Sequence, residues 1–224
     1  MRRAFVDAVR RAVRLGFDAG ELHMAHGYLL HSFQSPVSNR RADSWGGDRD
    51  GRMAFPLLVA RSVREAIPEA VGLGARITGS DWVEGGLDVD DAVAFASALK
   101  SIGVDSVCVS SGGVAPRARI PLGPGYQVPF AAKVKAETGL LTRAVGLIAD
   151  PHQAEGIVAR GEADCVALAR AMLDNPRWGW HAAESLGAAC PRPPQYDRAK
   201  PSVWPGATIA RPPIETPPLS VRVG

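Results

Sequence analysis

"GLGARITGS" at residues 72–80 is followed by "DVDDAVAFASALKSIG" at 88–103 and by "DSVCVSSGG" at 105–113, and these three segments decide the fold. The first and third are short apolar runs that predict β-strands. The second has apolar residues at helical spacing, a cap at Asp88 or Asp90 and a stop at Gly103. A strand, a helix and a strand at such short intervals indicate two parallel strands joined by a helical crossover.

The same alternation continues on both sides of this unit. Further strands are predicted at 20–25, 142–149 and 164–170, and helices at 2–15, 52–67, 128–138, 150–161 and within 171–187. A Rossmann sheet would show a glycine fingerprint in its first strand-to-helix turn, but "GLGARI" precedes a strand. The pattern therefore favours an α/β fold of the TIM (β/α)8 barrel type, here an incomplete barrel with about five βα units, because five strands cannot close one.

Composition excludes several classes of protein. Of 224 residues 46% are hydrophobic and 22% charged, the net charge is +3, and no apolar run is long enough for a membrane span. The basic residues are scattered, which argues against nucleic-acid binding and suits a cytoplasmic enzyme with an anionic ligand. Three dispersed cysteines argue against a disulfide framework or a metal cluster, and Cys108 and Cys165 are predicted to be small core residues.

The arginine-rich N-terminus and the proline-rich C-terminus are interpreted separately. Apolar residues at helical spacing in 2–15 indicate an ordinary amphipathic helix rather than a targeting peptide. After about residue 190 the helical and strand periods end. We therefore predict a domain over 1–190, followed by an extended arm and a disordered tail over 191–224.

Polar residues near the strand ends are candidates for a ligand site, because parallel sheets bind ligands at the carboxyl ends of their strands. "HMAHGY" (23–28) places His23, His26 and Tyr28 after one strand. The histidines could be satisfied by backbone, could bind a metal, although no third ligand has a convincing spacing, or could polarise an oxygen together. Arg76 inside a strand implies either an anion or an ion pair at the rim.

Four blocks of the sequence resemble the Old Yellow Enzyme family in order and spacing. They are "GFDAGELHMAHGYLLHSFQSPVSNRRADSWGG" (16–47), "IPLGPGYQVPFA" (120–131), "AVGLI" (144–148) and "ALARAMLDNPRW" (167–178). "QYDR" (195–198) resembles the C-terminal arm of the bacterial branch that includes xenobiotic reductases. The resemblance implies a TIM barrel, FMN as cofactor, NADH or NADPH as electron donor, and a chain that corresponds to strands four to eight.

The resemblance also implies roles for individual residues. His23 and His26 match the pair that anchors the substrate, and Tyr28 matches the proton donor. Arg76 matches the arginine beside the N1/O2 edge of the flavin, and Arg198 resembles an arginine finger that reaches a neighbouring subunit. The remaining residues implied are a phosphate site at Gly146, Ala169 and Arg170, a flavin or substrate mouth at Ser110, Ser111, Gly112 and Gly113, and a structural loop pinned by Asn39, Arg40 and Asp43.

The sequence departs from the family pattern at Ala169, at Trp45 and at "GGDRDG" (46–51), where the family commonly has "GGSLEN". The family commonly has glycine where Ala169 stands, so Ala169 is the least secure of the cofactor residues. Trp45 stands where tyrosine is usual, at a position outside the chemistry.

The function implied is an FMN-dependent ene-reductase that reduces the C=C bond of enones or similar electrophilic alkenes. Its predicted partners are this small molecule and, through the C-terminal arm, further copies of the chain. Two alternatives stay open: a catalytically silent, truncated portion of such an enzyme, and a phosphate-binding TIM-barrel enzyme without flavin. An aldolase-like version of the latter is weakened because no lysine ends a strand.

Overall fold

The structure, a computed structural model, describes residues 1–210. Its sheet consists of β1 (Ala19–His23), β2 (Gly72–Thr78), β3 (Ser106–Ser110), β4 (Leu141–Ala144) and β5 (Cys165–Val166). All neighbouring strands are parallel, and their order in space is their order in the chain. A doubly wound sheet would reverse its strand order at a switch point, whereas a barrel adds each strand beside the last. The predicted open section of a TIM-type barrel is confirmed.

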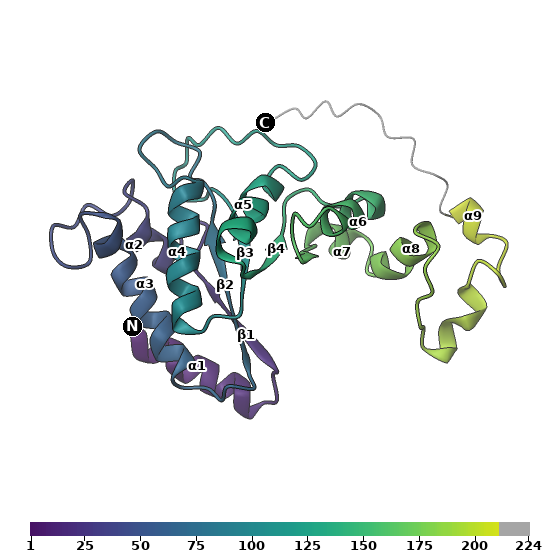
Figure 1. The fold of residues 1–224 in the computed structure, drawn as a ribbon. Helices are drawn as coiled ribbons and strands as arrows, with labels where there is room; N and C mark the ends of the chain where they lie inside the picture. Colours follow the sequence, from purple (N-terminus) through teal and green to yellow (C-terminus); the bar gives the residue numbers. More distant parts are fainter. Residues whose placement is uncertain (211–224) are drawn as a thin grey trace.

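Several helices pack over one face of this sheet (Figure 1). The helices are α1 (Arg2–Arg14), α2 (Leu29–Gln34), α3 (Arg49–Arg64), α4 (Val89–Ile102), α5 (Val128–Thr138), α6 (Pro151–Ala159), α7 (Arg170–Asp174), α8 (Trp178–Ser185), a 3-10 helix η1 (Pro194–Ala199) and α9 (Ala207–Ala210). Alternate strand residues such as Leu22, Ala75 and Val107 face these helices and form the core with Phe95 and Leu99 of α4.

The caps of α4 set its position between β2 and β3. The Asp88 carboxylate accepts the N–H groups of Asp90 and Asp91, and Gly103 ends the helix with a φ of 92°. A left-handed residue at this position costs little only when it is glycine. The predicted boundaries at 88 and 103 are therefore confirmed, with Asp88 rather than Asp90 as the cap.

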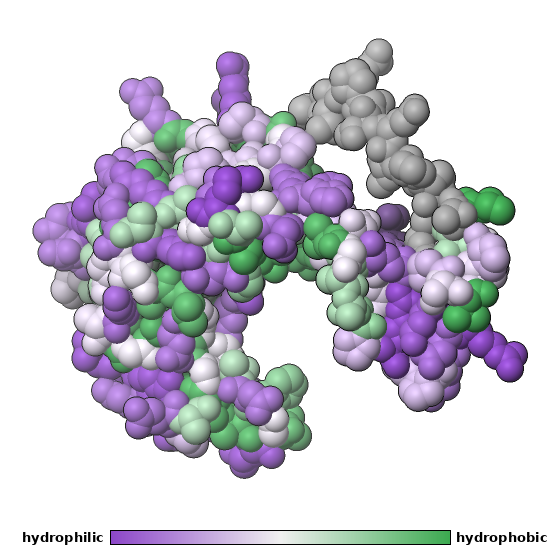
Figure 2. Space-filling model, turned by 45° about the vertical axis from the view of Figure 1, so that its right-hand side comes forward, coloured by the Kyte–Doolittle hydropathy of each residue, from purple (hydrophilic) through white to green (hydrophobic). Residues whose placement is uncertain are grey.

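The opposite face of the sheet carries polar side chains. One row across the five strands is His23, Arg76, Cys108, Arg143 and Cys165, which lie beside one another in register. His23 and Cys165 are exposed, and Leu141 on the same face is 59% exposed. This face corresponds to the interior of a barrel, and Figure 2 shows open space between the α/β layer and the C-terminal arm.

Cys165 is a correction to the sequence prediction. Cys108 is buried as predicted, because Arg76 and Arg143 flank it. Cys165 is exposed, since it lies on the outer strand of the sheet and on its polar face. An apolar sequence run does not show which face of an edge strand lacks a neighbour.

Several predicted boundaries were wrong. The strand expected at 142–149 ends at Ala144, the one expected at 164–170 ends at Val166, and α2 was not predicted. The arm expected to be extended contains η1 and α9, and η1 folds against α8 because Arg177 stacks on Tyr196 at 4.9 Å from the ring centre. The predicted disordered tail falls largely on 211–224, outside the described residues.

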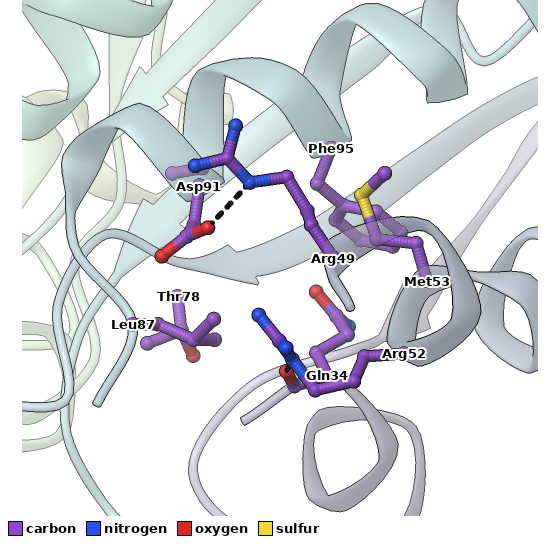
Figure 3. Close-up of a pocket in the computed structure, with 9 residues that line it drawn as sticks. Gln34, Arg49, Arg52, Met53, Thr78, Leu87, Asp91 and Phe95 are labelled. Atoms are coloured by element: carbon purple, nitrogen blue, oxygen red, sulfur yellow. Dashed lines mark hydrogen bonds and ion pairs between the residues drawn. The ribbon is translucent and has the colours of Figure 1, made fainter. Parts of the chain in front are cut away.

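A small cavity lies where α2, α3 and α4 meet (Figure 3). Its volume is about 10 Å³, enough for one water molecule. The Thr78 hydroxyl lines it and has no partner among residues 1–210, and the Arg49 guanidinium donates to Asp91 at 2.7 Å beside it. A substrate cannot enter a space of this size, so the candidate site must be sought elsewhere.

Candidate active site

Three aromatic rings gather at the carboxyl end of β1. The imidazole of His23, the last residue of the strand, lies 5.0 Å from that of His26 and 5.1 Å from the Tyr28 ring, measured between ring centres. The ring planes of the two histidines are inclined by 79°. Tyr28 is 63% exposed and His26 is half-buried. The three predicted residues of "HMAHGY" therefore form one cluster at the polar surface.

The turn that makes this cluster is backbone-strained and tightly packed. His26 has a φ of 60° and Gly27 a φ of 74°, both in the left-handed region. A Cβ on Gly27 would lie 2.3 Å from the Gly113 carbonyl oxygen, and one on Gly113 would lie 2.6 Å from the His26 Cα. Glycine at both positions thus lets the loops after β1 and β3 touch backbone to backbone.

A buried hydrogen-bond network continues from His26. The His26 Nε2 lies 2.7 Å from the Ser110 hydroxyl, which lies 3.2 Å from the Gln127 side-chain oxygen. The Ser111 hydroxyl donates to the same oxygen at 2.5 Å and accepts the Trp82 indole N–H at 2.8 Å. Ser110 and Ser111 were predicted to line the site. Gln127 and Trp82 were missed, although "GYQV" belonged to a block that resembles the family.

Both histidines of the cluster are neutral at pH 7. Burial, followed by the positive charge of Arg76, lowers the pKa of His23, and the same two causes lower the pKa of His26 to about 4. A neutral imidazole has one N–H and one bare nitrogen. The cluster therefore offers uncharged donors to a ligand.

The lowered pKa of His26 predicts how stability depends on pH. Below pH 6.5 the unfolded His26 takes up a proton, while the folded imidazole stays neutral down to about pH 4. The free energy of unfolding must therefore fall as the pH drops through this window. Because His26 is only half-buried, solvent reduces the effect.

The check is urea unfolding at pH 7 and pH 5 for the wild type and His26→Asn. The variant lacks this titration, so it should lose less stability on acidification than the wild type. Equal losses in both proteins would contradict the neutral folded imidazole.

Arg76 carries a buried hydrogen-bond donor without a partner in the described part of the chain. Its side chain lies on the polar face beside His23 in the register of the sheet. Its Nε is buried and has no hydrogen-bond partner among residues 1–210. A buried donor of this kind calls for an acceptor, and an ion pair at the rim, the alternative for this residue, is not formed with any described residue.

The predicted phosphate residues lie on the loops after β4 and β5. Gly146 has a φ of 118°, and a Cβ there would lie 2.6 Å from the Gln127 amide nitrogen, so packing as well as conformation requires glycine. Ala169 and Arg170 are exposed. Arg170 begins α7 instead of ending a strand, which corrects the predicted boundary.

Two other predictions fall beyond this cluster. The Asn39 amide donates to the carbonyls of Phe33 and Trp45, and the Asp43 carboxylate accepts the Trp45 N–H, so these residues pin their own loop as predicted. Arg198 is exposed in η1, and the arm projects away from the sheet (Figure 1). One chain therefore does not bring Arg198 to His26.

Metal and membrane predictions can be compared with the described part of the chain. Within residues 1–210 no three His, Cys, Asp or Glu side chains converge in a manner suited to a metal ion. Across the same residues, none of the helices is both long and apolar enough for a bilayer crossing.

The parallel strands in chain order, with donors gathered at their carboxyl ends, are the arrangement found in enzymes of the βα-barrel type. The chain belongs to the NADH:flavin oxidoreductase / NADH oxidase family, whose model matches residues 1–188. The family consists of oxidoreductases that use FMN with a nicotinamide electron donor, so the resemblance, the enzyme class and the cofactor prediction are confirmed at this level.

Curated relatives agree with this assignment. The chain is 48% identical over 195 residues to the NADPH dehydrogenase of Geobacillus thermodenitrificans (strain NG80-2), an alignment that covers 87% of this chain and 56% of that protein. It is 40% identical over 195 residues to the NADPH dehydrogenase of Listeria innocua, covering 87% and 57%. The chain thus spans about half the length of the relatives it matches.

Solved structures give the same fold. Morphinone reductase in complex with tetrahydroNAD superposes with a TM-score of 0.66 at 26% identity, over 87% of this chain and 50% of that one. A 2-naphthoyl-CoA reductase complex superposes with a TM-score of 0.77 over 82% and 29%, but at 24% identity this likeness concerns the fold alone.

Proposed function

We propose that the chain carries the substrate-binding residues of an FMN-dependent NAD(P)H oxidoreductase that reduces the C=C bond of enones or similar electrophilic alkenes. The observation that carries this proposal is the cluster of His23, His26 and Tyr28 at the end of β1. Two neutral imidazoles and one exposed phenol on one turn are suited to holding an oxygen and delivering a proton.

His23 and His26 bind the carbonyl oxygen of the substrate in this proposal. The Ser110 hydroxyl donates its one proton to the Gln127 side-chain oxygen at 3.2 Å, so the Ser110 oxygen accepts from the Nε2–H of His26 at 2.7 Å. In this proposal a bound substrate oxygen takes the place of Ser110 as the acceptor of that N–H. Negative charge builds on the oxygen when hydride reaches the β-carbon, so donors held in place beforehand stabilise the transition state more than the ground state.

Tyr28 supplies the proton to the α-carbon. Its ring lies beside His23, and its 63% exposure leaves the hydroxyl accessible to a bound substrate. A phenol holds its proton at neutral pH and can donate it to a carbon that gains electron density.

The cofactor residues are those on the neighbouring strand ends. FMN, when bound, supplies the hydride. Arg76 would offer its unpartnered Nε to the N1/O2 edge, and Ser110 and Gly112, which are buried at the end of the next strand, would support that side of the site from behind. Gly146, Ala169 and Arg170 follow the last two strands, where TIM barrels commonly bind phosphate, and we assign the phosphate of the cofactor to them.

The proposal also covers the electron donor, the assembly and the cellular location of the whole protein. NADH and NADPH are both suitable donors. Arg198 serves a second copy of the chain rather than its own site, which implies a homo-oligomer formed through the arm. We expect the protein in the cytoplasm.

The proposal is tested on the protein that carries this chain, purified with its flavin. Consumption of NADPH should be slow without acceptor and should rise on addition of 2-cyclohexenone, with cyclohexanone as the product by gas chromatography. The saturated ketone is the matched control, because it offers the same carbonyl without a C=C bond. A bleached flavin that no alkene re-oxidises would refute the assigned reaction.

Replacing Tyr28 with phenylalanine should slow turnover of weakly activated enones. Nitroalkenes should be less affected in the hydride step, because the nitronate that forms is stable enough to leave before it is protonated. Rapid-mixing kinetics with one substrate of each kind measures this contrast. Equal losses for both substrates would argue against Tyr28 as the proton donor.

A further inference from the structure

A third histidine, His31, contacts the turn that carries His26 and Tyr28. His31 of α2 is fully buried, and its Nδ1 accepts the backbone N–H of Gly27 at 2.7 Å. Its Nε2 lies 2.9 Å from one carboxylate oxygen of Asp81, which is also fully buried and follows β2. His31 thus links Gly27 of the loop after β1 to Asp81 of the loop after β2.

The hydrogen bonds fix the tautomer of His31. A backbone N–H can only donate, so Nδ1 must be bare, and the proton of the neutral ring resides on Nε2 and points to Asp81. The second oxygen of Asp81 accepts the Ser35 hydroxyl at 2.6 Å and the Leu87 N–H at 2.8 Å. Burial opposes the charge of Asp81, but these donors outweigh burial and lower its pKa, so it remains a carboxylate.

The bond to Gly27 lies at the centre of the turn that carries the reactive groups. Gly27 separates His26 from Tyr28, and both Gly27 and His26 have positive φ. Such a backbone persists only where the surroundings hold it in place. His31 provides the acceptor for the N–H at the centre of this turn, and Asp81 orients that acceptor.

We propose that His31 and Asp81 are positioning residues that hold His26 and Tyr28 in their reactive geometry. The inference rests on the proposed function for its effect on catalysis. Its structural content, that the carboxylate of Asp81 sets the His31 tautomer and thereby the Gly27 bond, does not depend on which reaction the site performs.

Asp81→Asn separates orientation from packing. The variant side chain is the same size, but its amide N–H groups would face donors. An amide N–H aimed at Nε2 stabilises the opposite tautomer, which turns an Nδ1–H toward the Gly27 N–H. The turn then loses its acceptor. Glu84→Gln is the matched control, because Glu84 is an exposed acid on the same loop.

Two substitutions of His31 each keep one of its two hydrogen bonds and remove the other. Asn places a carbonyl oxygen near the position of Nδ1, so His31→Asn keeps an acceptor for Gly27 and loses the donor to Asp81. Gln places an N–H near the position of Nε2, so His31→Gln keeps the donor and loses the acceptor. If the role of His31 is purely structural, the less stable of the two variants is also the less active one. If His31 positions the turn, His31→Asn is the less stable variant but the more active one, because it keeps the acceptor for Gly27.

The experiment uses the flavin-loaded protein with its histidines labelled with 15N. For Asp81→Asn we expect the His31 resonances to change to those of the Nδ1–H tautomer, faster hydrogen exchange in the peptide that contains Gly27, and a kcat for enone reduction lower by about 10²-fold, the usual effect of small misplacements. Glu84→Gln should match the wild type. The thermal midpoints and kcat values of the two His31 variants complete the comparison.

An unchanged tautomer and unchanged exchange in Asp81→Asn would overturn the inference, as would a kcat of His31→Gln equal to or above that of His31→Asn. A wild-type protein without alkene-dependent turnover would instead refute the proposed function. The tautomer and exchange measurements would still decide the structural part.

Discussion

Replacing His23 and His26 together with alanine is expected to slow enone reduction by at least about 10²–10³-fold, the usual consequence of losing one donor to a developing oxyanion. The two imidazoles lie 5.0 Å apart between ring centres and are neutral, so each offers a hydrogen bond without a charge that would have to be desolvated. Alanine removes both donors and leaves the oxygen to water. The loss should appear mainly in the oxidative half-reaction, measured by rapid mixing with the enone.

His152→Ala is the control for this prediction, because His152 is an exposed histidine on α6, remote in sequence from the β1 turn. It should leave the rate unchanged. If the double variant oxidised its flavin with the enone as fast as the wild type, the assignment of the pair would be wrong. A slower reductive half-reaction in the double variant would add that the same pair also receives the nicotinamide.

The 224-residue chain expressed by itself is expected not to yield a soluble yellow monomer. Both outer strands of its sheet, β1 and β5, have an edge with no neighbouring strand in residues 1–210, and such edges promote association. The polar face that carries Arg76 is open, and Leu141 on that face is exposed. An isoalloxazine placed against it would meet protein on part of its surface only.

The measurement is size-exclusion chromatography with absorbance of the flavin after purification in excess FMN. We expect aggregates, oligomers or a colourless protein. A monomer with one FMN per chain would contradict this prediction. A colourless but folded chain would favour the alternative of a catalytically silent portion over an active enzyme.

Local signals were sufficient for the elements whose ends are set by their own residues. Gly103 could be assigned as the end of α4, and its start could be narrowed to Asp88 or Asp90, because capping and left-handed conformations depend on nearby atoms. The strand at 142–149 was predicted too long, because "VGLI" remains apolar after β4 has ended at Ala144. Hydrophobicity indicates burial, and a residue of the following loop, Ile148, is buried as well.

Long-range contacts explain what the sequence could not indicate about the site. His23, His26 and Tyr28 lie within six residues of one another, and their clustering was predicted. The Ser110 contact to His26 joins positions 84 residues apart, and that of His31 to Asp81 joins positions 50 residues apart. The six-residue helix α2 is too short to be identified from hydrophobic periodicity. Its buried residue His31 contacts Asp81, which is distant in the sequence.

The order of the strands has a consequence for synthesis. Each of β1 to β4 pairs with the strand that follows it in the chain, so within residues 1–210 no strand pairs out of sequence order. Parallel pairs such as Ala19 with Gly72 close long crossovers and form slowly, and chains emerge from the ribosome from the N-terminus. Each βα unit can therefore dock on its predecessor during translation, and the newest strand of the growing sheet offers its free edge to the strand that follows.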